Sequence, residues 1–414
     1  MLWLHSALYS YGLQASIWRN VPPWSELLIL GTRGRYSAPI LPHNEPLRVQ
    51  RAILTKNTMR VGVLTFHWAD NYGAVLQAHG LCQTLKSLGH VVRFIDYVLP
   101  TERLAWGRGW GLRSGRQLPV NVLRRFRYEK FRHDHLPLSR PCHTAEDLRA
   151  VSAEFDAVIV GSDQVWNGNI LRFDDAPYFL DFVDKRCCRR ISYAACFGER
   201  DQPRQTLEVA ALLLPEFGSL SVRNEMSADL VSDLSGRAAT VVLDPTLLHD
   251  FSDVFKPSPR KASYIAAYHV SKDAANVSLG QKIQRAARQH LQLPIVAIGP
   301  DAVSVHGDSA IVSAGPSEWL RLLHGASFIC TDSYHGTLFA TKYRKPFITW
   351  SGLRTARISS FLDTCGLRSR LIGSPESSVP KELLETPIDY DAVFERLVPR
   401  INASRTFLES ALGS

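Results

Sequence analysis

The chain has 414 residues, enough for two or three domains, and its 45% hydrophobic and 21% charged content is ordinary for a globular protein. The sequence has no apolar run of the roughly 18 residues that span a bilayer, and its seven Cys show neither a CxxC pair nor a Cys/His ligand spacing. These features exclude a membrane-spanning or disulfide-stapled protein, and they predict a cytoplasmic protein without a metal site.

The net charge of +9 is concentrated in two segments. Residues 1–58 carry +4 and residues 103–140 carry +8, so the rest of the chain is slightly acidic. Local charge of this kind argues against a nucleic-acid-binding protein. The 103–140 segment also contains the aromatic residues Trp106, Trp110, Phe126, Tyr128 and Phe131. A solvated insertion with a partly buried aromatic face is the favoured interpretation; the alternative is contact with an anionic membrane, which would place the protein at the inner face of that membrane.

Residues 1–58 lack clear periodicity, contain five Pro at Pro22, Pro23, Pro39, Pro42 and Pro46, and have no charged region typical of a signal peptide. Met59 comes directly before a clean strand pattern. Two hypotheses follow: translation begins at Met59, or residues 1–58 are a poorly ordered extension. The intact mass of the native protein distinguishes them.

From Met59 onward, strand and helix patterns alternate. Strands are predicted at Val61–Phe66, Val91–Asp96, Ala157–Val160, Ile191–Ala195, Leu220–Arg223, Thr240–Leu243, Tyr264–Tyr268, Ile295–Ile298, Ile311–Val312, Phe328–Thr331 and Pro346–Trp350. Helices are predicted at Ala74–Leu88, from Ser227, and at Gln281–His290, Ser317–His324 and Tyr390–Ser410. This alternation predicts an α/β fold with parallel sheets covered on both faces. It forms two runs, so we expect two Rossmann-like domains, 59–236 and 237–414, that face each other across a cleft.

The most informative stretch runs from Ser327 to Trp350 and reads as a strand, a polar turn, a helix and a second strand. The turn contains Asp332 and His335 at the carboxyl end of a strand, where open α/β sheets bind ligands. The amino end of the helix attracts anions and favours neutral His335, whereas Asp332 favours the charged ring. His335 is therefore predicted to act in acid–base chemistry on an anionic substrate.

Two further turns follow predicted strands of the first domain. In the first, Asn71 can cap a helix, and Gly73 allows a ligand or backbone to approach closely. The turn lacks GxGxxG, which argues against dinucleotide binding. The second turn, Gly161–Asn167, combines amides, a carboxylate and an indole, as a sugar site would; a capped loop with a core Trp is the alternative.

Arg223 ends a predicted strand, where its fork can bind a carboxylate or phosphate. A salt bridge to Glu225 or Asp229 is an equal alternative. The Asp244–Thr246 triplet is interpreted as a structural turn. Arg357 could line the cleft or lie exposed at the surface.

Taken together, these motifs resemble the polysaccharide pyruvyl transferases. The matching pieces span Met59 to about Ile372 in the family's order: VGVLTFHWADNYGAVLQAHGL, FDAVIVGSDQVWN, YFLDFVDKRCCRRISYAACFG, LSVRNEMSADLV, VVLDPTLL, GPSEWLRLLHGASFICTDSYHGTLFATKYRKPFI and TARISSFLDTCGL. Residues 1–58 and 103–140 lie outside the clear match. Single pieces are weak signals, but seven in order are specific.

The resemblance implies a GT-B-like fold and the transfer of a pyruvyl group from phosphoenolpyruvate to hydroxyls of a sugar in a cell-surface polysaccharide or its precursor, often as a ketal. It implies that His335 is catalytic, with the acceptor on the first domain and the donor on the second. Some family members have Arg two places before this His, where this chain has Ser333. The phosphate would then be held by Arg223, Arg357 or Lys342, or the donor differs.

The predicted site has three groups of residues. The catalytic residues are His335, Asp332 and Asp163, with Asp163 or Asp70 taking the hydroxyl proton. The donor-binding residues are Arg223, Ser333, Tyr334, Gly336 and Arg357. The acceptor-binding residues are Asn71, Tyr72, Gly73, Ser162, Gln164, Trp166 and Asn167.

Phosphoenolpyruvate is the expected co-substrate, with no cofactor. The acceptor is a sugar or a lipid-linked oligosaccharide. Two alternatives stay open: a GT-B glycosyltransferase that uses a nucleotide sugar, since fold does not fix function, and a non-catalytic glycan-binding member of a polysaccharide assembly.

Overall fold

The computed structural model describes residues 58–98, 118–172, 175–257, 263–300, 307–351, 356–373 and 379–413. All of them belong to one unit, Leu54–Ser414. The two hypotheses about residues 1–58 concern a segment that lies almost wholly outside the described residues.

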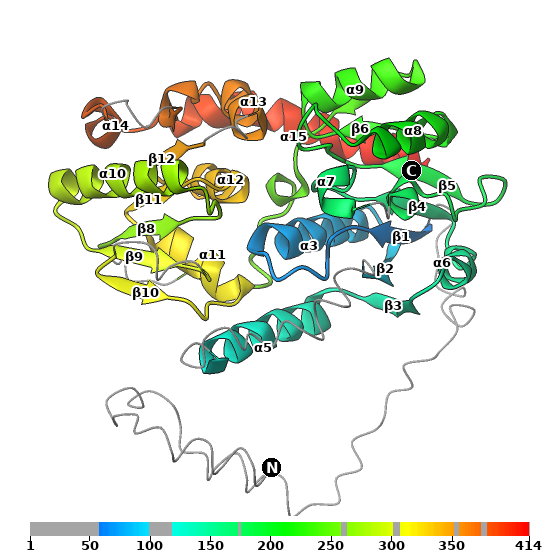
Figure 1. Cartoon of the computed structure of the whole chain (residues 1–414), viewed down its shortest axis with the longest axis horizontal. Coiled ribbons are helices and arrows are strands. Elements are labelled where there is room, and N and C mark those ends of the chain that lie inside the picture. Colours follow the sequence, from blue (N-terminus) through cyan, green and yellow to red (C-terminus); the bar gives the residue numbers. More distant parts are fainter. Residues whose placement is uncertain are drawn as a thin grey trace, which may run out of the picture. The chain divides into compact units, whose positions relative to one another are not determined.

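The first half of the chain forms a five-stranded sheet in which every neighbouring pair of strands is parallel (Figure 1). Its order is β3-β2-β1-β4-β5, and its strands are β1 Arg60–Leu64, β2 Val91–Tyr97, β3 Leu138–Cys142, β4 Ala157–Val160 and β5 Arg189–Ser192. A short parallel pair, β6 Ser221–Val222 and β7 Thr240–Val241, follows. The helices are α3 Tyr72–Ser87, α5 Leu118–His135, α6 Ala145–Ser152, α7 Gly168–Leu171, α8 Arg204–Leu213 and α9 Glu225–Ser235, with 3-10 turns η3 Ala176–Phe179 and η4 Leu214–Glu216.

The second half forms a six-stranded parallel sheet of order β10-β9-β8-β11-β12-β13. Its strands are β8 Ile265–Tyr268, β9 Ile295–Ile298, β10 Ser309–Ile311, β11 Phe328–Thr331, β12 Phe347–Trp350 and β13 Leu371–Ile372. The helices are α10 Ala274–Leu291, α11 Pro316–Gly325, α12 Tyr334–Lys342, α13 Ala356–Cys365, α14 Glu382–Glu385 and α15 Tyr390–Leu412, with 3-10 turns η5 Pro245–Leu247 and η7 Arg368–Arg370.

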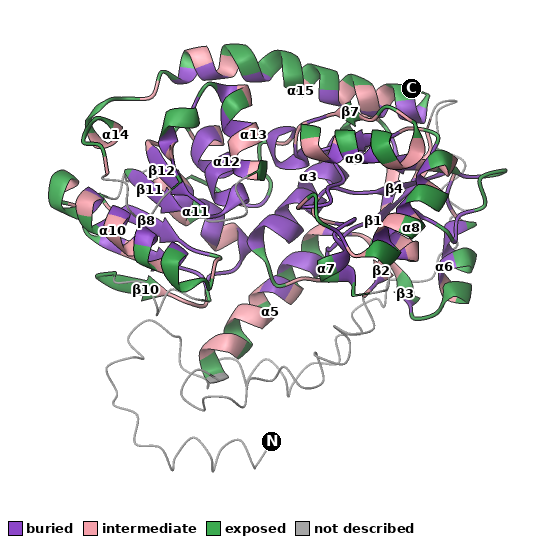
Figure 2. Cartoon of the chain, turned by 45° about the horizontal axis from the view of Figure 1, so that its top comes forward, coloured by how far each residue is buried: buried purple, intermediate pink, exposed green. Residues whose placement is uncertain are grey.

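Strands β4, β8, β11 and β12 are buried along their whole length, as their short apolar runs predict for central strands of parallel sheets (Figure 2). The predicted α/β class is therefore confirmed. Most observed strands begin and end within two or three residues of the predicted bounds. The domain limits at 58/59 and 236/237 stay predictions.

Helix α3 joins the two halves. Tyr72, in its first turn, stacks on Trp319 of α11 with ring centroids 5.1 Å apart, and its hydroxyl donates to the Ala314 carbonyl at 2.8 Å. Both rings are almost completely buried. Burial of such a side chain stabilises a fold by about 1.5–3 kcal/mol. The prediction that Tyr72 binds the acceptor is therefore corrected, because its ring and hydroxyl are both used in packing.

Helix α15 also connects the halves. Its last turns pack beside β1, where Leu408 and Leu412 share a core cluster with Val61. The Ser404 hydroxyl accepts from the Leu243 amide at 2.9 Å. The end of the chain thus contributes to the core of the first sheet.

The described part of the basic segment is mostly structural. In α5, Tyr128 and Phe131 are buried, Arg127 donates to the Ser313 carbonyl at 2.9 Å, and Arg132 pairs with Asp70 at 2.8 Å. The Asp70 carboxylate is thus held by a buried guanidinium. The partly buried aromatic face and the exposed Phe126 both match the favoured interpretation of this segment as a solvated insertion. Trp106 and Trp110 lie outside the described residues.

Among the helices that the structure describes, none combines the length and apolar character needed to cross a bilayer.

Candidate active site

Three strand ends supply the site. The turn after β1 leads into α3, the loop after β4 contains Ser162 and Asp163, and the turn after β11 leads into α12. In α12, Ser333 is the N-cap, and its hydroxyl accepts from the Gly336 amide at 3.2 Å. This cap starts the helix so that His335 lies in its first turn, 7% exposed.

His335 lies beside a carboxylate that the sequence analysis placed in a structural turn. Its Nε2 is 3.4 Å from Asp244 Oδ2, and the Asp244 side chain is fully buried. Nε2 is itself buried and has no hydrogen-bond partner among the described residues. Asp244 can therefore stabilise a charged His335 ring while leaving its proton available to a ligand.

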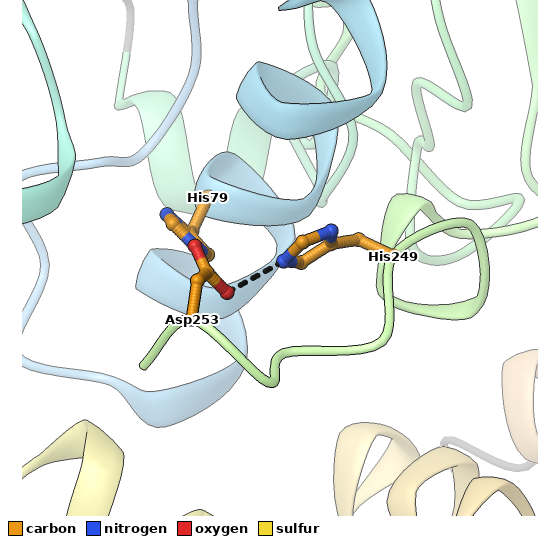
Figure 3. A group of neighbouring side chains, drawn as sticks. All are labelled: His79, His249 and Asp253. Atoms are coloured by element: carbon orange, nitrogen blue, oxygen red, sulfur yellow. Dashed lines mark hydrogen bonds and ion pairs between the residues drawn. The ribbon is translucent and has the colours of Figure 1, made fainter. Parts of the chain in front are cut away.

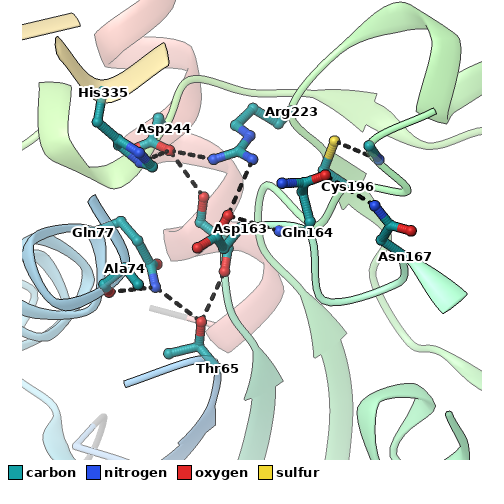
Figure 4. Close-up of polar contacts among 12 residues, drawn as sticks. Thr65, Ala74, Gln77, Asp163, Gln164, Asn167, Cys196, Arg223, Asp244 and His335 are labelled. Atoms are coloured by element: carbon teal, nitrogen blue, oxygen red, sulfur yellow. Dashed lines mark hydrogen bonds and ion pairs between the residues drawn. The ribbon is translucent and has the colours of Figure 1, made fainter. Parts of the chain in front are cut away.

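Asp244 is also the centre of a wider polar network (Figure 4). Its Oδ2 accepts from Arg223 at 2.8 Å and from the Ser162 hydroxyl at 3.1 Å, and its Oδ1 accepts from the Thr246 amide at 3.0 Å. Burial opposes its ionisation, but His335, Arg223 and the Thr246 amide together hold the pKa of Asp244 well below its ordinary value. Asp244 is therefore a charged, structurally fixed carboxylate and a poor proton acceptor.

Arg223 brings a buried guanidinium to the same place. Its side chain is 1% exposed, and besides Asp244 it faces Asp163 at 3.5 Å. Its Nε and Nη2 atoms are buried and have no hydrogen-bond partner among the described residues. Burial alone would lower the pKa of Arg223, but the surrounding ionisable groups raise it instead. The fork thus has unused N–H groups that could bind an anionic oxygen. Its ion-pair partners are Asp244 and Asp163. The alternative prediction, a salt bridge to Glu225 or Asp229, is therefore wrong.

The guanidiniums of Arg223 and Arg357 both lie near the ring of Tyr334. The Arg223 guanidinium carbon is 4.6 Å from the centroid of the Tyr334 ring, and that of Arg357 is 5.8 Å from it. Burial and the neighbouring Arg223 lower the pKa of Arg357. Two cations this close repel each other unless an anion lies between or beside them. The structure therefore brings together three of the five predicted donor-binding residues.

Gly73 explains how the two halves meet at His335. A Cβ atom at Gly73 would lie 2.6 Å from Cε1 of His335 and closer still to Nδ1. The His335 ring thus rests directly on the backbone of α3, which has no room for a side chain. The predicted acceptor role of Gly73 is replaced by close backbone approach, which the sequence analysis had considered.

Asp163 has a backbone φ of +90°, rare for a residue other than glycine. Its Oδ1 accepts from the Gln164 amide at 2.9 Å, and its side chain is 14% exposed. The strained backbone holds the carboxylate beside Arg223, at the position expected for a group that meets a substrate. Gln164, half-buried, accepts from Asn167 at 2.9 Å next to it.

Asp332, predicted to be catalytic, is a structural anchor. Its carboxylate accepts from the amides of Val270 and Ser271 at 2.8 and 3.0 Å and from Asn276 Nδ2 at 2.9 Å. These bonds fix the loop after β8 to the turn that contains His335. Its oxygens are occupied, so the catalytic prediction for Asp332 is corrected to a positioning role.

Three cap or helix residues also differ from their predicted roles. The Ser333 hydroxyl is used by the cap, and Gly336 packs its backbone against Thr331. Lys342 lies in the last turn of α12, about 10 Å along the helix from His335. Its Nζ is over the Phe251 ring, where burial lowers its pKa to about 8. Of the three predicted phosphate-binding cations, Arg223 and Arg357 share one site and Lys342 does not.

Three acceptor predictions are likewise corrected. Trp166 is fully buried, stacks on Phe179 at 5.4 Å and donates to the Tyr178 carbonyl, so neither ring face can meet a sugar. Asn167 is buried and accepts from a helix amide as an N-cap. Asn71 also caps a helix, but it is exposed, so its acceptor role stays a prediction. Ser162 donates to Asp244. In the loop after β4, Asp163 and Gln164 keep partly exposed side chains.

The arrangement can bind an anion at the two guanidiniums and supply a proton from His335 beside it. Asp244, which holds the two parts together, is the residue that the sequence analysis missed. The Asp-Pro-Thr triplet was visible in the sequence, but a carboxylate before Pro is common at turns. The partners that reveal its role are distant in the chain, since Arg223 lies 21 positions before Asp244 and His335 lies 91 positions after it.

Comparison with known proteins supports the fold and identifies a family. The sequence profile of the family described as polysaccharide pyruvyl transferase matches residues 71–351. A search of curated proteins finds no match. Among solved structures, a UDP-N-acetylglucosamine 2-epimerase is 12% identical with a TM-score of 0.50, over 86% of this chain and 95% of that chain.

Two further solved structures have lower TM-scores. The Neisseria meningitidis UDP-GlcNAc 2-epimerase bound to UDP-GlcNAc is 12% identical, with a TM-score of 0.45 over 84% of this chain and 93% of that chain. The E. coli heptosyltransferase WaaC with ADP is 13% identical, with a TM-score of 0.39 over 83% of this chain and 100% of that chain. The structural likeness is one of fold, which is GT-B-like, whereas the profile match covers well over half of the sequence. The chain therefore belongs to the polysaccharide pyruvyl transferase family.

Proposed function

We propose that this protein transfers a pyruvyl group from phosphoenolpyruvate to hydroxyls of a sugar in a cell-surface polysaccharide or its precursor, forming a pyruvate ketal. The observation that carries the proposal is the joining of His335 and Arg223 by one buried carboxylate, Asp244. The proposal gives His335 the role of proton donor and Arg223 that of anion-binding group, and their common contact with Asp244 supports action on one small molecule.

Donor binding follows from charge. Phosphoenolpyruvate carries a phosphate and a carboxylate, and each matches the two-pronged geometry of a guanidinium. Arg223 offers Nε and Nη2 atoms that have no hydrogen-bond partner among the described residues, and the Arg357 guanidinium lies 5.8 Å from the centroid of the Tyr334 ring that Arg223 also contacts. Because both guanidiniums are pre-placed by packing on Tyr334, they can stabilise the phosphate as it leaves.

Proton transfer follows from the position of His335. Its Nε2 gives a proton to the methylene carbon of the donor, which becomes the methyl group of the product. The Asp244 carboxylate, 3.4 Å away, stabilises the charged ring before this step. The neighbouring carbon then has the character of an oxocarbenium ion and accepts the oxygen of a sugar hydroxyl.

Asp163 is the candidate base for that hydroxyl, because its carboxylate is partly exposed beside Arg223. Asp70 is less suitable, because Arg132 holds it at 2.8 Å. When a second hydroxyl attacks the same carbon, the bond to the phosphate oxygen breaks and inorganic phosphate leaves. Of the two hydroxyl hydrogens, one replaces the proton that His335 donated and the other leaves on phosphate, so the atoms balance.

The experiment that tests the proposal follows phosphate release from phosphoenolpyruvate by the purified protein with a panel of oligosaccharide acceptors. We expect release only when an acceptor is present, together with an acceptor mass increase matching one pyruvyl ketal. Parallel titration with nucleotide sugars tests the glycosyltransferase alternative. Turnover of a nucleotide sugar, or no release across a broad panel, would overturn the proposal.

Gly73→Ala is expected to lower the turnover number by about tenfold to 100-fold, because a new Cβ must push the His335 ring from its place and a shift near 1 Å can cost that much. Phosphate release at saturating donor measures it. Gly218→Ala is the matched control, since its Cβ would be 3.5 Å from the nearest backbone oxygen. Equal activity of the two variants would contradict the expectation.

A further inference from the structure

A second polar cluster lies on the same helix as Gly73 and is not used in the proposed reaction. The His79 cluster consists of His79, His249 and Asp253 (Figure 3). His79 Nε2 is 2.8 Å from Asp253 Oδ2, and His249 Nε2 is 2.7 Å from Asp253 Oδ1. One ligand-type atom from each of the three residues lies within 4.8 Å of the others.

The cluster is assembled from segments far apart in the chain. His79 lies in the middle of α3, whereas His249 and Asp253 follow η5 at a spacing of four. A third imidazole is near: the His135 ring, at the end of α5, has its centroid 5.4 Å from that of His79. Three imidazoles and one carboxylate therefore meet where α3, α5 and the segment after η5 contact one another.

A network of ordinary His–Asp ion pairs does not account for this arrangement. One carboxylate cannot balance three imidazolium charges, and the His79 side chain is fully buried. A ring nitrogen of each imidazole can donate a lone pair to a metal ion, so a metal ion would use the two rings and the carboxylate of this cluster together.

A buried atom without a partner gives a second, independent reason. His79 Nδ1 is buried and has no hydrogen-bond partner among the described residues, which is costly for a polar atom in the interior. The ring is therefore not fully satisfied by Asp253.

We propose that the His79 cluster binds one divalent transition-metal ion of the zinc type, with His79, His249 and Asp253 as ligands. Two imidazoles and a carboxylate suit Zn²⁺, whereas Mg²⁺ and Ca²⁺ prefer oxygen alone. Ligands about 2.0 Å from a tetrahedral ion lie about 3.3 Å apart. The three ligand atoms lie within 4.8 Å of one another, so the side chains need to close by at most about 1.5 Å to reach that spacing.

The metal would act as a structural clamp. It would tie α3, whose first turn supports His335 through Gly73, to the segment that begins with Asp244 and continues to Asp253. Binding of a ligand to the folded state alone stabilises that state. This inference does not rest on the proposed transfer reaction. No metal site is predicted from the sequence, because His79 lies about 170 residues before the His249–Asp253 pair and the chain has no Cys/His ligand spacing.

The test uses the full-length protein after treatment with a chelator. Titration calorimetry with Zn²⁺ is expected to give one ion per chain, and Co²⁺ is expected to give the visible absorption of a four-coordinate nitrogen and oxygen site. Zn²⁺ should raise the melting temperature. His249→Ala and Asp253→Ala are each expected to lower Zn²⁺ affinity at least tenfold.

His133→Ala is the matched control, because His133 lies in α5 two residues before His135 and its side chain is 81% exposed. It should bind Zn²⁺ as the unmodified protein does. Less than one equivalent bound by the unmodified protein, or equal affinity in His249→Ala and His133→Ala, would overturn the proposal. The stoichiometry and the Co²⁺ spectrum need no variant, so they decide the question even where a variant unfolds.

Discussion

His335→Gln is expected to lower the rate of pyruvyl transfer by about 10²–10⁴-fold, the range that a positioned general acid contributes. Glutamine keeps a similar volume and a hydrogen-bonding end, but it cannot carry the proton that the methylene carbon must gain. The turnover number should fall while the KM for phosphoenolpyruvate changes little, because Arg223 and Arg357 remain in place. Phosphate release at varied donor concentration separates the two parameters.

His324→Gln is the matched control, since His324 is half-buried in α11 and packs only on aromatic rings in the described contacts. Its activity should match that of the unmodified protein. Thermal unfolding of both variants shows whether lost activity reflects lost structure. A His335→Gln variant that keeps full activity would remove His335 from the mechanism and leave the fold and family unaffected.

The sequence predicted the sheet architecture well because its signals are local. Central parallel strands are short apolar runs, and the runs at Ala157–Val160, Ile295–Ile298 and Phe328–Thr331 match β4, β9 and β11 residue for residue. Helix α5 was missed, because its charged residues conceal a short apolar stripe that only tertiary contact reveals. Tyr128 and Phe131 on that stripe are buried against the rest of the fold.

The site was predicted only in part, because residue type and strand-end position do not say where a side chain points. His335, Arg223 and Arg357 were placed in the site from their chemistry, and the structure brings them together. Trp166 has equally suitable chemistry for a sugar, yet it fills the core beneath its loop. Local sequence cannot separate an aromatic ring that faces a ligand from one that faces the core.

Asp244 was predicted to be structural but lies in the site, the reverse of Trp166. Its sequence context is that of a turn, and η5 does begin at the next residue, with Asp244 accepting from the Thr246 amide. The same carboxylate also holds Arg223 and lies beside His335. A turn residue thus has a second role that depends on contacts 21 and 91 positions away in sequence. Such pairings become visible only once the two sheets are assembled.

Asp244→Asn is expected to be the most destabilising of the substitutions considered, by about 3–5 kcal/mol. It leaves the Arg223 guanidinium, 1% exposed, without its closest anionic partner. Domains are commonly stable by only about 5–15 kcal/mol, so urea unfolding at pH 7 should detect the change clearly. Asp250→Asn is the matched control, because Asp250 lies nearby in sequence but is exposed.

The effect should depend on pH in a definite direction. The pKa of Asp244 in the folded protein lies below its value of about 3.9 in unfolded chains, so its charge stabilises the fold fully above about pH 5. That contribution is lost as the pH falls further. The difference in unfolding free energy between the unmodified protein and Asp244→Asn should therefore shrink between pH 5 and pH 3. A constant difference would mean that folding does not lower the pKa of Asp244, and a difference that grows would mean that Asp244 is uncharged in the folded state.

Activity should fall together with stability, because the same carboxylate serves both of its neighbours. If Asp244 acts by stabilising the charged His335 ring, the two single variants Asp244→Asn and His335→Gln remove one function, and their effects on turnover should not add. The double variant should then be little slower than His335→Gln alone. Additive losses would instead mean that Asp244 contributes to turnover separately from His335, through the position of Arg223.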